Sequence, residues 1–536
     1  MGRVANQPAL EASADVLVIG GGPAGTWAAL AAAAKGASVV LVDKGYCGTS
    51  GATAPSGTGV WYVEPTARER EEAMGSREAL GGYLADRGWM ARVLDRTYAN
   101  MNELALAGYP FPLDEDGRPY RRSLQGPEYM KLMRRRVKQA GVLVWDHCPA
   151  QELLTDSYGV GGARGVQLRT GKPWLVKAGA VVIASGGCAF LSSALGCNVL
   201  TGDGYLFAAE AGACLSGMEF SNAYAISPTF STITKTAFYT WASFYRGDGT
   251  LIEEAGSQRG RSVIARTLQT QPVYARLDRT TEEMRRWMRL AQPNFFLSFD
   301  RLGIDPFTQK FPITLRLEGT VRGTGGIHLI DESCATAVPG LYAAGDAASR
   351  QFICGGFTGG GSHNAAWAMS SGFWSGEAAA GYSFGLGRLS GKRELAGLRP
   401  SGESASVPVS HGDVRDLAAS VKRQVEPFEI NLFRTESGLK QSLARLDRIW
   451  LEARGGSADS AADAVKLREV QAMAATARWM YASALARKET RGMHKRLDYP
   501  DTDSAQHYRL LSGGLEEVWV KPESAARQAT GEVQAG

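Results

Sequence analysis

The sequence lacks most features that mark the common alternative classes of protein. Its seven cysteines are an odd number, and none has the CxxC or similar spacing of a metal or iron–sulfur ligand set. It has no uninterrupted apolar run of about 18 residues and no apolar run before Asp15. Its net charge is only +5, and no basic run is interleaved with aromatic residues. We therefore expect a cytoplasmic protein with no metal, no membrane span and no nucleic-acid partner.

Glycine, in contrast, is abundant. The chain has 65 glycines among 536 residues, above the usual share of about 7%, without repeats or low complexity. Glycine lets the backbone approach a neighbouring group closely, so this excess is typical of a protein that surrounds a bound cofactor. The length predicts about three or four structural units.

The first glycines follow a predicted strand. Residues 15 to 43 read DVLVIGGGPAGTWAALAAAAKGASVVLVD. The apolar run Val16–Ile19 ends in a glycine cluster, an alanine-rich helix pattern follows, and a second apolar run, Ser38–Val42, ends in Asp43. This order predicts a βαβ unit that binds a dinucleotide.

Each glycine of this unit has a physical role. Gly20 permits the tight turn, Gly22 lets the backbone reach a pyrophosphate at the helix N-terminus, and Gly25 lets helix and strand pack closely. Asp43 is placed to accept a ribose hydroxyl, and an acid there favours an adenosine ribose without a 2′-phosphate. Both FAD and NAD meet that requirement.

Later segments favour FAD. Residues 180–187, AVVIASGG, and residues 338–348, VPGLYAAGDAA, are predicted strands that end in small residues, and TGDGYLFAAEAGA at 201–213 begins a helix. Such turns far apart in the sequence predict one sheet whose strand ends gather around a single long ligand. The pair Gly345 and Asp346 resembles the second FAD motif of flavoproteins with two dinucleotide-binding domains, in which the aspartate binds the ribityl chain.

With these motifs in place, the chain resembles one family almost from end to end. This is the superfamily of fumarate reductase and succinate dehydrogenase flavoprotein subunits, with L-aspartate oxidase and the alpha subunit of adenylylsulfate reductase. The matching segments are DVLVIGGGPAG, TSGATAPSGTG, ASGG, TGDG, MEF, RGRSVIAR, GTGGIHLIDESCAT, GLYAAGD and RKETRGMHKRLDYP. The resemblance implies an FAD-dependent oxidoreductase that moves a hydride between flavin N5 and a small anionic or polarised substrate.

The motifs and the resemblance together predict the FAD site. The predicted FAD-binding residues are Gly20, Gly22, Pro23, Ala24, Gly25, Asp43, Lys44, Ser50, Gly51, Ala52, Ala184, Ser185, Gly186, Gly187, Asp203, Gly345, Asp346, Gly361 and Ser362. Membrane dicarboxylate enzymes of the family usually carry, at the position of Gly51, a histidine that bonds covalently to the flavin. The resemblance therefore implies non-covalent FAD, whose lower potential favours reduction of the substrate.

Histidines that bind substrate in the family are missing from this chain. Ser227, Val321 and Arg350 stand at or near positions where relatives carry them. The segments SRQFICGGFTGG at 349–360 and QGPEY at 125–129 look more like the adenylylsulfate reductase alpha subunit than like succinate dehydrogenases. These differences argue against both the ordinary dicarboxylate pocket and the ordinary adenylylsulfate pocket.

The predicted catalytic residues are Arg261, Arg322, Arg350 and His363. The resemblance places a proton-transferring arginine at Arg261, whose planar fork would also clamp an anion. The alternative is a surface helix arginine, which suits Arg259 or Arg266 better. His363 is either a proton donor or hydrogen-bond partner of the flavin, or a residue that caps backbone groups at a helix start.

Other polar residues are further candidates. Asn364 is polar and near the predicted flavin, and His328 is either structural or a contact to the flavin edge. In RKETRGMHKRLDYP, at 487–500, the resemblance implies that Arg491 and His494 pack back toward the active-site side.

The predicted fold class is α/β, with a Rossmann-type FAD-binding domain, an inserted α+β capping domain that excludes water from the substrate, and a C-terminal helical domain. The predicted units are 1–215 (FAD-binding domain, first part, with 61–129 inserted), 216–317 (cap), 318–385 (FAD-binding domain, second part), 386–413 (exposed linker), 414–521 (helical domain) and 522–536 (disordered tail).

Three alternative functions remain open from the sequence. The first is an adenylylsulfate-reductase-like subunit that receives electrons from a ferredoxin-type partner, and the second is an oxidase like L-aspartate oxidase. The third is a flavin-binding electron-transfer subunit without its own substrate. The expected partners are a small-molecule substrate and a ferredoxin-like or other electron-transfer protein, and an oligomer is compatible with the sequence.

Overall fold

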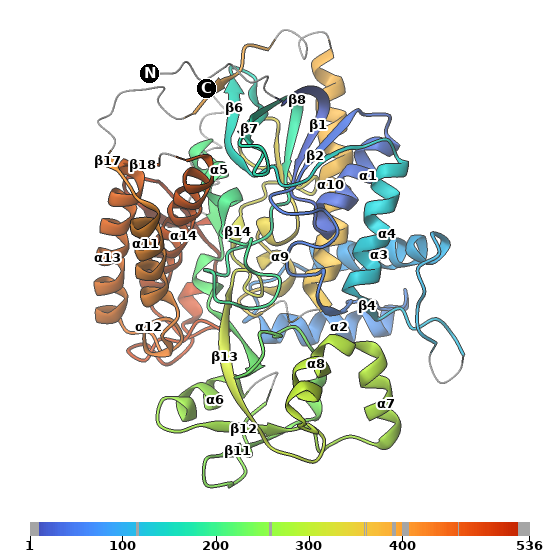
Figure 1. Ribbon diagram of the computed structural model, residues 1–536, viewed down its shortest axis with the longest axis vertical. Coiled ribbons are helices and arrows are strands. Elements are labelled where there is room, and N and C mark those ends of the chain that lie inside the picture. The colour runs from blue at the N-terminus through green and yellow to red at the C-terminus, as the bar shows by residue number, and fades with distance from the viewer. Residues whose placement is uncertain are drawn as a thin grey trace.

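The computed structural model describes residues 10–113, 117–256, 260–358, 360, 362–387, 393–398, 407–458 and 460–523. A central sheet with helices against it forms the upper part of the molecule in Figure 1, a smaller sheet with its own helices lies below, and long helices stand at one side. The predicted FAD contact Gly361 and the tail beyond Glu523 lie outside the described residues.

The central sheet has eight strands. They are β1 Leu10–Ile19, β2 Val39–Val42, β5 Leu143–Trp145, β6 Ala150–Asp156, β7 Gly159–Val166, β8 Pro173–Ile183, β15 Leu341–Ala343 and β16 Ala396–Gly397. Their order is β16-β6-β7-β8-β1-β2-β5, with β15 also paired to β8. The β1, β2, β5, β8 and β15 pairings are parallel, and the four residues of β2 are all buried, as expected for a sheet covered on both faces.

Several of the parallel strands end at the same level. Ile19 lies opposite both Val42 and Ile183, and Ala343 also lies opposite Ile183. The turns that follow these strands therefore gather at one edge of the sheet, where α/β proteins bind their ligands.

Two helices pack closely on the sheet, α1 Pro23–Ala34 and α10 Ser362–Leu386. A Cβ atom at Gly372 would lie 2.3 Å from the carbonyl oxygen of Ala24, and one at Gly376 would lie 2.1 Å from that of Ala28. The two helix backbones can therefore touch only because α10 has glycine at these positions.

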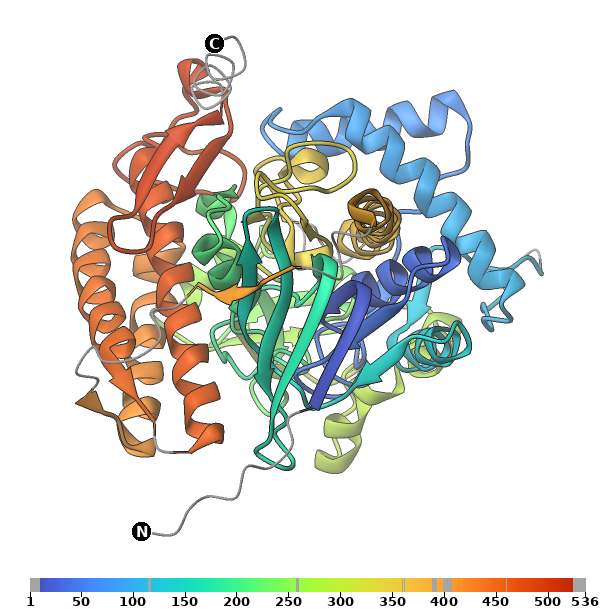
Figure 2. The same ribbon diagram turned by 90° about the horizontal axis from the view of Figure 1, so that it is seen from above.

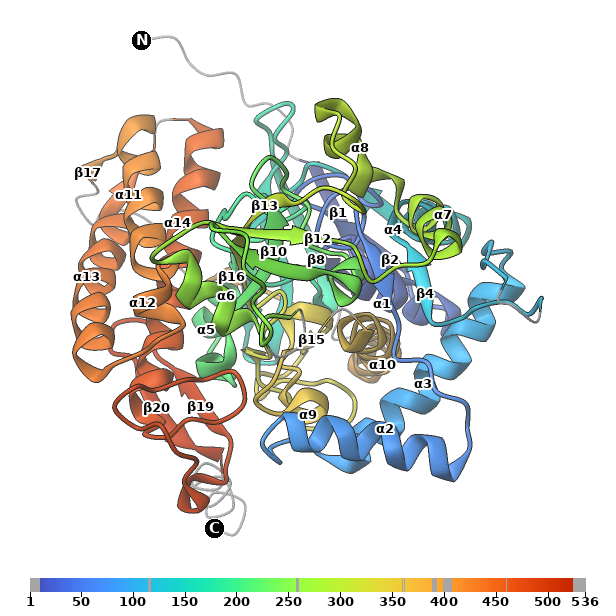
Figure 3. The same ribbon diagram turned by 90° about the horizontal axis from the view of Figure 1, so that it is seen from below.

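The segment inserted after β2 is mostly helical. Its elements are β3 Gly57–Gly59, α2 Ala67–Leu80, α3 Arg87–Leu106, β4 Ser123–Gln125 and α4 Gly126–Gln139. Thr66 accepts a hydrogen bond from the Glu69 amide to begin α2, and Asp86 does the same for the Trp89 amide at α3. Helices α2 and α3 lie beside α10 (Figure 3).

The cap is an antiparallel sheet with three helices, seen from below in Figure 3. Its elements are β10 Ala223–Pro228, β11 Ser243–Arg246, α6 Arg261–Leu268, β12 Val273–Arg276, α7 Glu282–Ala291, α8 Pro293–Leu302 and β13 Phe311–Gly319. The strand order is β10-β13-β12-β11. Phe238, Phe295 and Phe299 are buried between this sheet and α8, and their rings form the core of the cap.

Long helices form the C-terminal part of the chain, at the left of Figures 1 and 2. They are α11 His411–Val425, α12 Phe428–Asn431, α13 Glu436–Gly455 and α14 Ala461–Ala486. Hydroxyl side chains of Ser410, Thr435 and Ser460 cap the amides that begin α11, α13 and α14. The predicted α/β fold class, with its Rossmann-type sheet and C-terminal helical domain, is confirmed.

The predicted helical domain, 414–521, is helical only as far as Ala486. Beyond it, β19 Leu510–Gly513 and β20 Trp519–Pro522 form a four-stranded sheet with β9 Leu215–Ser216 and β14 Gly326–Ile327. The pairing of β19 with β9 is made across nearly 300 residues of chain, so local patterns do not reveal it. The remaining short elements are α5 Asp203–Glu210, α9 Gln351–Cys354, β17 Val407–Pro408 and β18 Gly456–Ser457.

The span 386–413 differs from the predicted exposed linker at Arg393. This side chain is buried, and its guanidinium forms an ion pair with Asp156 at 2.6 Å and donates to the carbonyl of Gly159 at 2.8 Å. The adjacent β16 extends the central sheet, because its residues pair with β6. None of the helices in the described part of the chain has the combined length and hydropathy of a membrane span.

Candidate active site

A cavity of about 710 Å³ lies where the parallel strands end. Its walls come from the turns after β1, β2, β8 and β15, from α2, and from the cap segments around residue 235 and at the start of α6. Clefts of this size at the carboxyl edge of a parallel sheet are typical of cofactor sites.

The glycines after β1 make one end of this cavity. Gly20 has a φ of +113°, and a Cβ atom there would lie 2.3 Å from the carbonyl oxygen of Ala184. A Cβ atom at Gly25 would lie 1.8 Å from the carbonyl oxygen of Gly20, whereas one at Gly22 would meet no atom within 4 Å. Gly20 and Gly25 therefore bring turn, strand and helix into contact, and Gly22 leaves open space before the N-terminus of α1, where a phosphate can bind.

Asp43, at the end of β2, shapes the same turn. Its Oδ2 accepts from the Gly21 amide at 2.6 Å, and its Oδ1 accepts from the Gly45 amide at 2.7 Å and the Ser50 hydroxyl at 2.8 Å. The neighbouring Lys44 ammonium lies 2.7 Å from a carboxylate oxygen of Asp203 and 2.7 Å from one of Glu469. Both side chains line the cavity, although their charged groups already have protein partners.

Asp346 and Arg350 follow β15, and only the aspartate lines the cavity. Arg350 is fully buried, forms an ion pair with Asp346, and donates to the carbonyls of Thr320 at 2.7 Å and Val321 at 3.2 Å. Burial raises the pKa of Asp346, and the positive charge of Arg350 works in the opposite direction. Arg350, predicted as a catalytic residue, thus directs its guanidinium at the aspartate and at backbone carbonyls and does not line the cavity.

His363 begins α10 and is also buried outside the cavity lining. The Nε atom of Arg77 lies 2.9 Å from its Nε2, the Ser362 hydroxyl lies 3.0 Å from its Nδ1, and its ring lies 4.4 Å from that of Trp61. From this group, Arg77 of α2 and Ser362 line the cavity. His363 therefore acts on the cavity through Arg77 rather than by direct contact.

Positive side chains gather where the cap meets the cavity. Arg261 at the start of α6, Arg322 after β13, and Lys235 in the loop after β10 all line it. Glu318, fully buried on β13, lies 2.8 Å from the Lys235 ammonium and 2.5 Å from the Nε atom of Arg322. In the described part of the chain the Nε atom of Arg261 has no hydrogen-bond partner. Lys235 and Arg322 therefore share one carboxylate, and Arg261 has no ion-pair partner among the described residues.

The pKa values follow from these neighbours. Burial, together with the nearby charge of Arg322, lowers the pKa of the Arg261 guanidinium to about 10. Burial alone would raise the pKa of Glu318, but the charges of Arg322 and Lys235 lower it to about 2. Burial would lower the pKa of Lys235, yet Cys197 and Glu318 raise it above its usual value. Arg261, Glu318 and Lys235 are therefore charged at neutral pH, and the cluster has more basic than acidic side chains.

Two family models match the chain. The model described as an FAD binding domain covers residues 15–232, which include the glycine cradle, and the model described as the fumarate reductase flavoprotein C-terminal domain covers residues 425–527. Over these two regions the chain is similar to the flavoproteins of the fumarate reductase and succinate dehydrogenase superfamily. It is an FAD-dependent oxidoreductase.

Relatives of this flavoprotein match it over most of their length. The fumarate reductase flavoprotein subunit of Mycobacterium tuberculosis is 25% identical, and the match covers 98% of this chain and 99% of the relative. The 8-methylmenaquinol:fumarate reductase flavoprotein subunit of Wolinella succinogenes is 26% identical over 92% of this chain and 87% of its own. L-aspartate oxidase of M. tuberculosis is 26% identical over 95% of this chain and 97% of its own.

Solved structures share the flavoprotein fold. An E. coli quinol fumarate reductase chain superposes with a TM-score of 0.81, at 20% identity, over 96% of this chain and 97% of that one. The adenylylsulfate reductase of Archaeoglobus fulgidus superposes with a TM-score of 0.77, at 18% identity, over 96% of each. These likenesses show the fold alone.

Most predicted FAD-binding residues of the flavoprotein line the cavity. Those that do are Gly20, Gly22, Pro23, Ala24, Asp43, Lys44, Ser50, Gly51, Ala52, Ala184, Ser185, Gly186, Asp203, Gly345, Asp346 and Ser362. Gly25 and Gly187 do not, because each packs against protein: a Cβ atom at Gly187 would lie 2.5 Å from the Thr320 hydroxyl. The open space at Gly22 beside the N-terminus of α1 fits the pyrophosphate of FAD.

The substrate end of the cavity differs from that expected for the family at the positions where the sequence lacks the expected histidines. Val321 lines the cavity at one histidine position, whereas Ser227, near another, is buried and donates to the carbonyl of Ser231 at 2.9 Å. Among the described residues no histidine lines the cavity. Asn364 does line it and donates to the Val321 carbonyl at 2.7 Å, while the His328 ring lies 6.3 Å from that of Phe352, away from the cavity.

Sequence reasoning missed three charged residues of the site: Arg77, Lys235 and Glu318. Arg77 falls within AREREEAMGSREAL, whose charges are typical of a solvated helix. Glu318 gave no signal of burial, because it shares the alternating polar positions of its strand with Thr314 and Arg316. Lys235 lies in a loop and gave no signal either.

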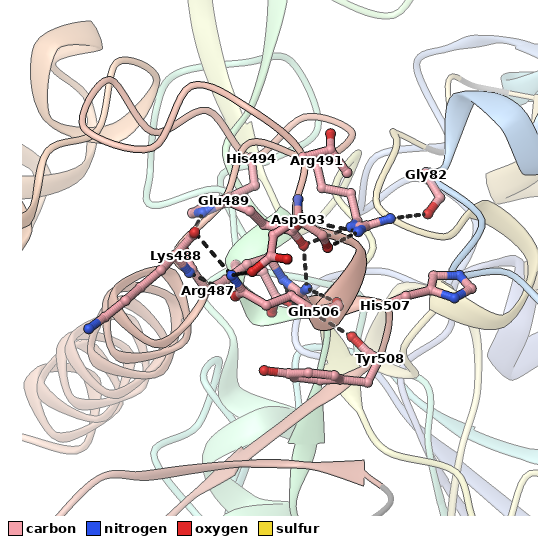
Figure 4. A network of polar contacts seen from close by, with 12 residues as sticks. Gly82, Arg487, Lys488, Glu489, Arg491, His494, Asp503, Gln506, His507 and Tyr508 are labelled. Atoms are coloured by element: carbon pink, nitrogen blue, oxygen red, sulfur yellow. Dashed lines mark hydrogen bonds and ion pairs between the residues drawn. The ribbon is translucent and has the colours of Figure 1, made fainter.

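The segment RKETRGMHKRLDYP lies at a buried junction, shown in Figure 4, rather than in the cavity. Glu489 accepts from Arg487 at 2.9 Å and from Arg491 at 2.7 Å, and Arg491 also donates to the Gly82 carbonyl at 2.7 Å. Burial and the charges of Arg434 and Arg487 hold the pKa of His494 well below its ordinary value. Arg491 therefore joins the C-terminal part to the loop that follows α2, and neither it nor His494 lines the cavity.

Proposed function

We propose that the protein transfers a hydride between N5 of non-covalently bound FAD and a small anionic substrate, which Arg261 binds. Hydride transfer at N5 is the chemistry that bound FAD supplies. The observation that carries the proposal is that Arg261 lines the cavity, has an unpaired Nε atom and has no ion pair within the described residues. A cation removed from water without a counterion is costly, and an anionic ligand would offset that cost.

The chain's own residues would hold FAD in defined places. The backbone at Gly22 and the N-terminus of α1 would take the pyrophosphate, Asp43 the adenosine ribose, and Asp346 the ribityl chain. Gly51 lines the cavity and has no side chain that could form a covalent bond to the flavin. The FAD should therefore leave the protein when the protein unfolds.

At the substrate end the cations have different roles. Arg322 and Lys235 are held by Glu318, so they give the wall a fixed positive field. Arg261 keeps donors for the ligand and orients it with its planar fork. Because its pKa is lowered to about 10, its proton is also more available to a substrate carbon than that of an ordinary arginine.

An anaerobic screen of the purified holoprotein tests the proposal. The dithionite-reduced flavin is mixed with unsaturated carboxylates such as fumarate and with 2-oxoacids, and the oxidised flavin is mixed with their saturated counterparts. We expect one of these anions to change the flavin oxidation state at least tenfold faster than its neutral amide. If none does, or if the amides react equally well, the proposal fails. Acid precipitation of the same sample should leave all FAD in the supernatant.

An electron-transfer partner is part of this proposal. Relatives such as the Wolinella enzyme are flavoprotein subunits, and we propose that a ferredoxin-like or other electron carrier in the cytoplasm exchanges electrons with this flavin. Reduction of the holoprotein by a reduced ferredoxin at a rate that saturates with ferredoxin concentration would support this. A rate no greater than that of small dyes would argue against it.

A further inference from the structure

Helix α2 brings a second arginine, Arg77, to the cavity from a different part of the chain than Arg261. Its side chain is partly buried and packs against three neighbours. The Nε atom lies 2.9 Å from Nε2 of His363, Nη1 donates to the carbonyl of Thr358 at 3.3 Å, and the guanidinium lies 5.9 Å from the centre of the Phe357 ring. Phe357 and Thr358 line the cavity with it.

The positive charge of Arg77 has no carboxylate beside it. Within the described residues no Asp or Glu forms an ion pair with this guanidinium. The neighbouring titratable group that raises the pKa of Arg77 is the Cys354 thiol. Burial lowers the pKa of Arg77. A guanidinium has five N–H donors, and the contacts to His363 and Thr358 engage only part of this set. The remaining donors belong to a side chain that lines the cavity.

The protein fixes the position of this arginine from behind. The Gly81 amide donates to the Arg77 carbonyl at 2.9 Å and ends α2. The next residue, Gly82, accepts from Nη1 of Arg491 at 2.7 Å, and a Cβ atom at Gly82 would lie 2.6 Å from Cγ of Arg491. Figure 4 shows Arg491 extended toward Gly82 from the C-terminal segment. The last turn of α2 is therefore held in place. A guanidinium on a fixed turn binds an anion at a lower cost in conformational entropy than a mobile one.

We propose that Arg77 binds an anionic group of the substrate, at a point supplied by α2 and separate from the cations of the cap. This inference rests on the proposed function, because it assigns a second contact to the same substrate. His363 is then a positioning residue: it holds the Arg77 fork through its ring nitrogens and does not itself touch the ligand. The hydrogen-bond partners printed for Arg77 within the described residues include no carboxylate, which leaves its charge for the ligand, whereas Arg322 shares its charge with Glu318.

Ligand titrations of the oxidised holoprotein test this assignment. Malonate carries two carboxylates and malonamate carries one, and binding of either is read from the flavin absorbance. We expect the wild-type protein to bind malonate at least tenfold more tightly than malonamate. Arg77→Gln should weaken malonate binding about 10- to 100-fold, the value of a lost charge-assisted pair, and should leave little preference between the two ligands.

Two further variants make the result specific. Arg77→Lys keeps the charge without the fork, and we expect malonate binding between those of wild type and Arg77→Gln. Arg68→Gln removes an arginine of the same helix whose side chain is 88% exposed and pairs with Glu72, and it should bind malonate as wild type does. FAD content measured for each variant shows whether it is folded, and Arg77→Lys carries the test if Arg77→Gln loses its flavin.

The remaining outcomes separate the explanations. If Arg77→Gln and Arg77→Lys keep the wild-type preference for malonate while Arg261→Gln loses malonate binding, the Arg77 assignment is overturned and the proposed function stands. If Arg77→Gln shifts the flavin reduction potential and leaves the preference unchanged, Arg77 acts on the flavin and the assignment is again overturned. If wild type binds neither ligand, this inference and the anionic-substrate proposal fall together.

Discussion

Arg261 and Glu318 show how neighbours set the charge of single residues in this site. Glu318 is fully buried yet ionised, because Lys235 and Arg322 lie within 2.8 Å and 2.5 Å of its oxygens and lower its pKa to about 2. Arg261 lies near the same cluster but without a close acid, and burial lowers its pKa to about 10. A bound anion would act on Arg261 as Glu318 acts on Lys235, and it would raise the pKa of Arg261 again.

Anion binding should therefore depend on pH in a way that reports on Arg261. A base whose pKa is lowered to about 10 is charged below that value, so malonate affinity should be constant from about pH 7 to pH 9 and should fall as pH rises through about 10. Lys235 has a raised pKa and stays charged across this range. Titrations of the flavin absorbance at each pH give the affinity.

In Arg261→Gln the part of this decline that Arg261 causes should be absent, whereas a part caused by Arg77, whose pKa burial also lowers, should remain. A wild-type affinity that stays flat to pH 10.5, or a decline that persists unchanged in Arg261→Gln, would assign the titration to another group.

The cofactor residues were predictable because their signals are local, whereas the charged residues were less so. Gly20, Gly22 and Asp43 occur in order within one strand–turn–helix unit, so the sequence indicates their positions. Arg350 and Arg77 have no such local signal. Arg350 is engaged by carbonyls of residues 320–323, and Arg77 is brought in by a helix far from them in the chain. Which charge faces the cavity is decided by tertiary contacts.

The junction between elements at the C-terminal end of α2 depends on buried ion pairs. Glu489 is fully buried and lies between the guanidinium groups of Arg487 and Arg491, and the second oxygen of Glu489 accepts from the Asp503 amide at 2.8 Å. Removing one member of such a cluster leaves buried charges uncompensated. This cluster joins the segment after α14 to the loop after α2 (Figure 4).

Glu489→Gln should therefore destabilise the holoprotein strongly, by about 3–5 kcal/mol, because two buried arginines would lose their shared carboxylate. The matched control is Glu436→Gln at the start of α13, where the carboxylate is 40% exposed and pairs with an exposed lysine, and it should lower the unfolding midpoint far less. Thermal unfolding followed by the release of flavin fluorescence compares the two. Equal midpoints for the two variants would show that the buried cluster contributes little to stability.

Helices with a strong hydrophobic periodicity could be predicted from the sequence, whereas short strands that form only by pairing with a distant strand could not. The long helices α11, α13 and α14 have apolar stripes and capping hydroxyls, so their existence follows from the sequence. Strand β19 is four residues long and is stabilised by the edge of β9, and β16 pairs with β6 inside the span predicted to be an exposed linker. Such short segments have little intrinsic preference for the strand conformation, and they become strands because a neighbouring strand pairs with them.

At the scale of the whole molecule, the cavity is the place where separate parts of the chain meet. The parallel sheet supplies the glycine turns, the cap supplies Arg261 and Lys235, and the inserted segment supplies Arg77. The C-terminal part contributes Glu469, which pairs with Lys44 of the cavity wall, and it holds the end of α2 through Arg491. The family resemblance identified the fold and the cofactor, while the substrate end, where this chain departs from its relatives, required the structure.

The central claim is that Arg261 binds the anionic substrate at the flavin. The most direct test is anaerobic stopped-flow mixing of the reduced holoprotein with the best anionic acceptor from the screen, in wild type and in Arg261→Gln. We predict that the variant keeps its FAD and its rate of reoxidation by air but reoxidises with the anion at least about 100-fold more slowly, as expected when a charged donor to the reacting group is lost. Equal rates of reoxidation by the anion in the two proteins would contradict the account.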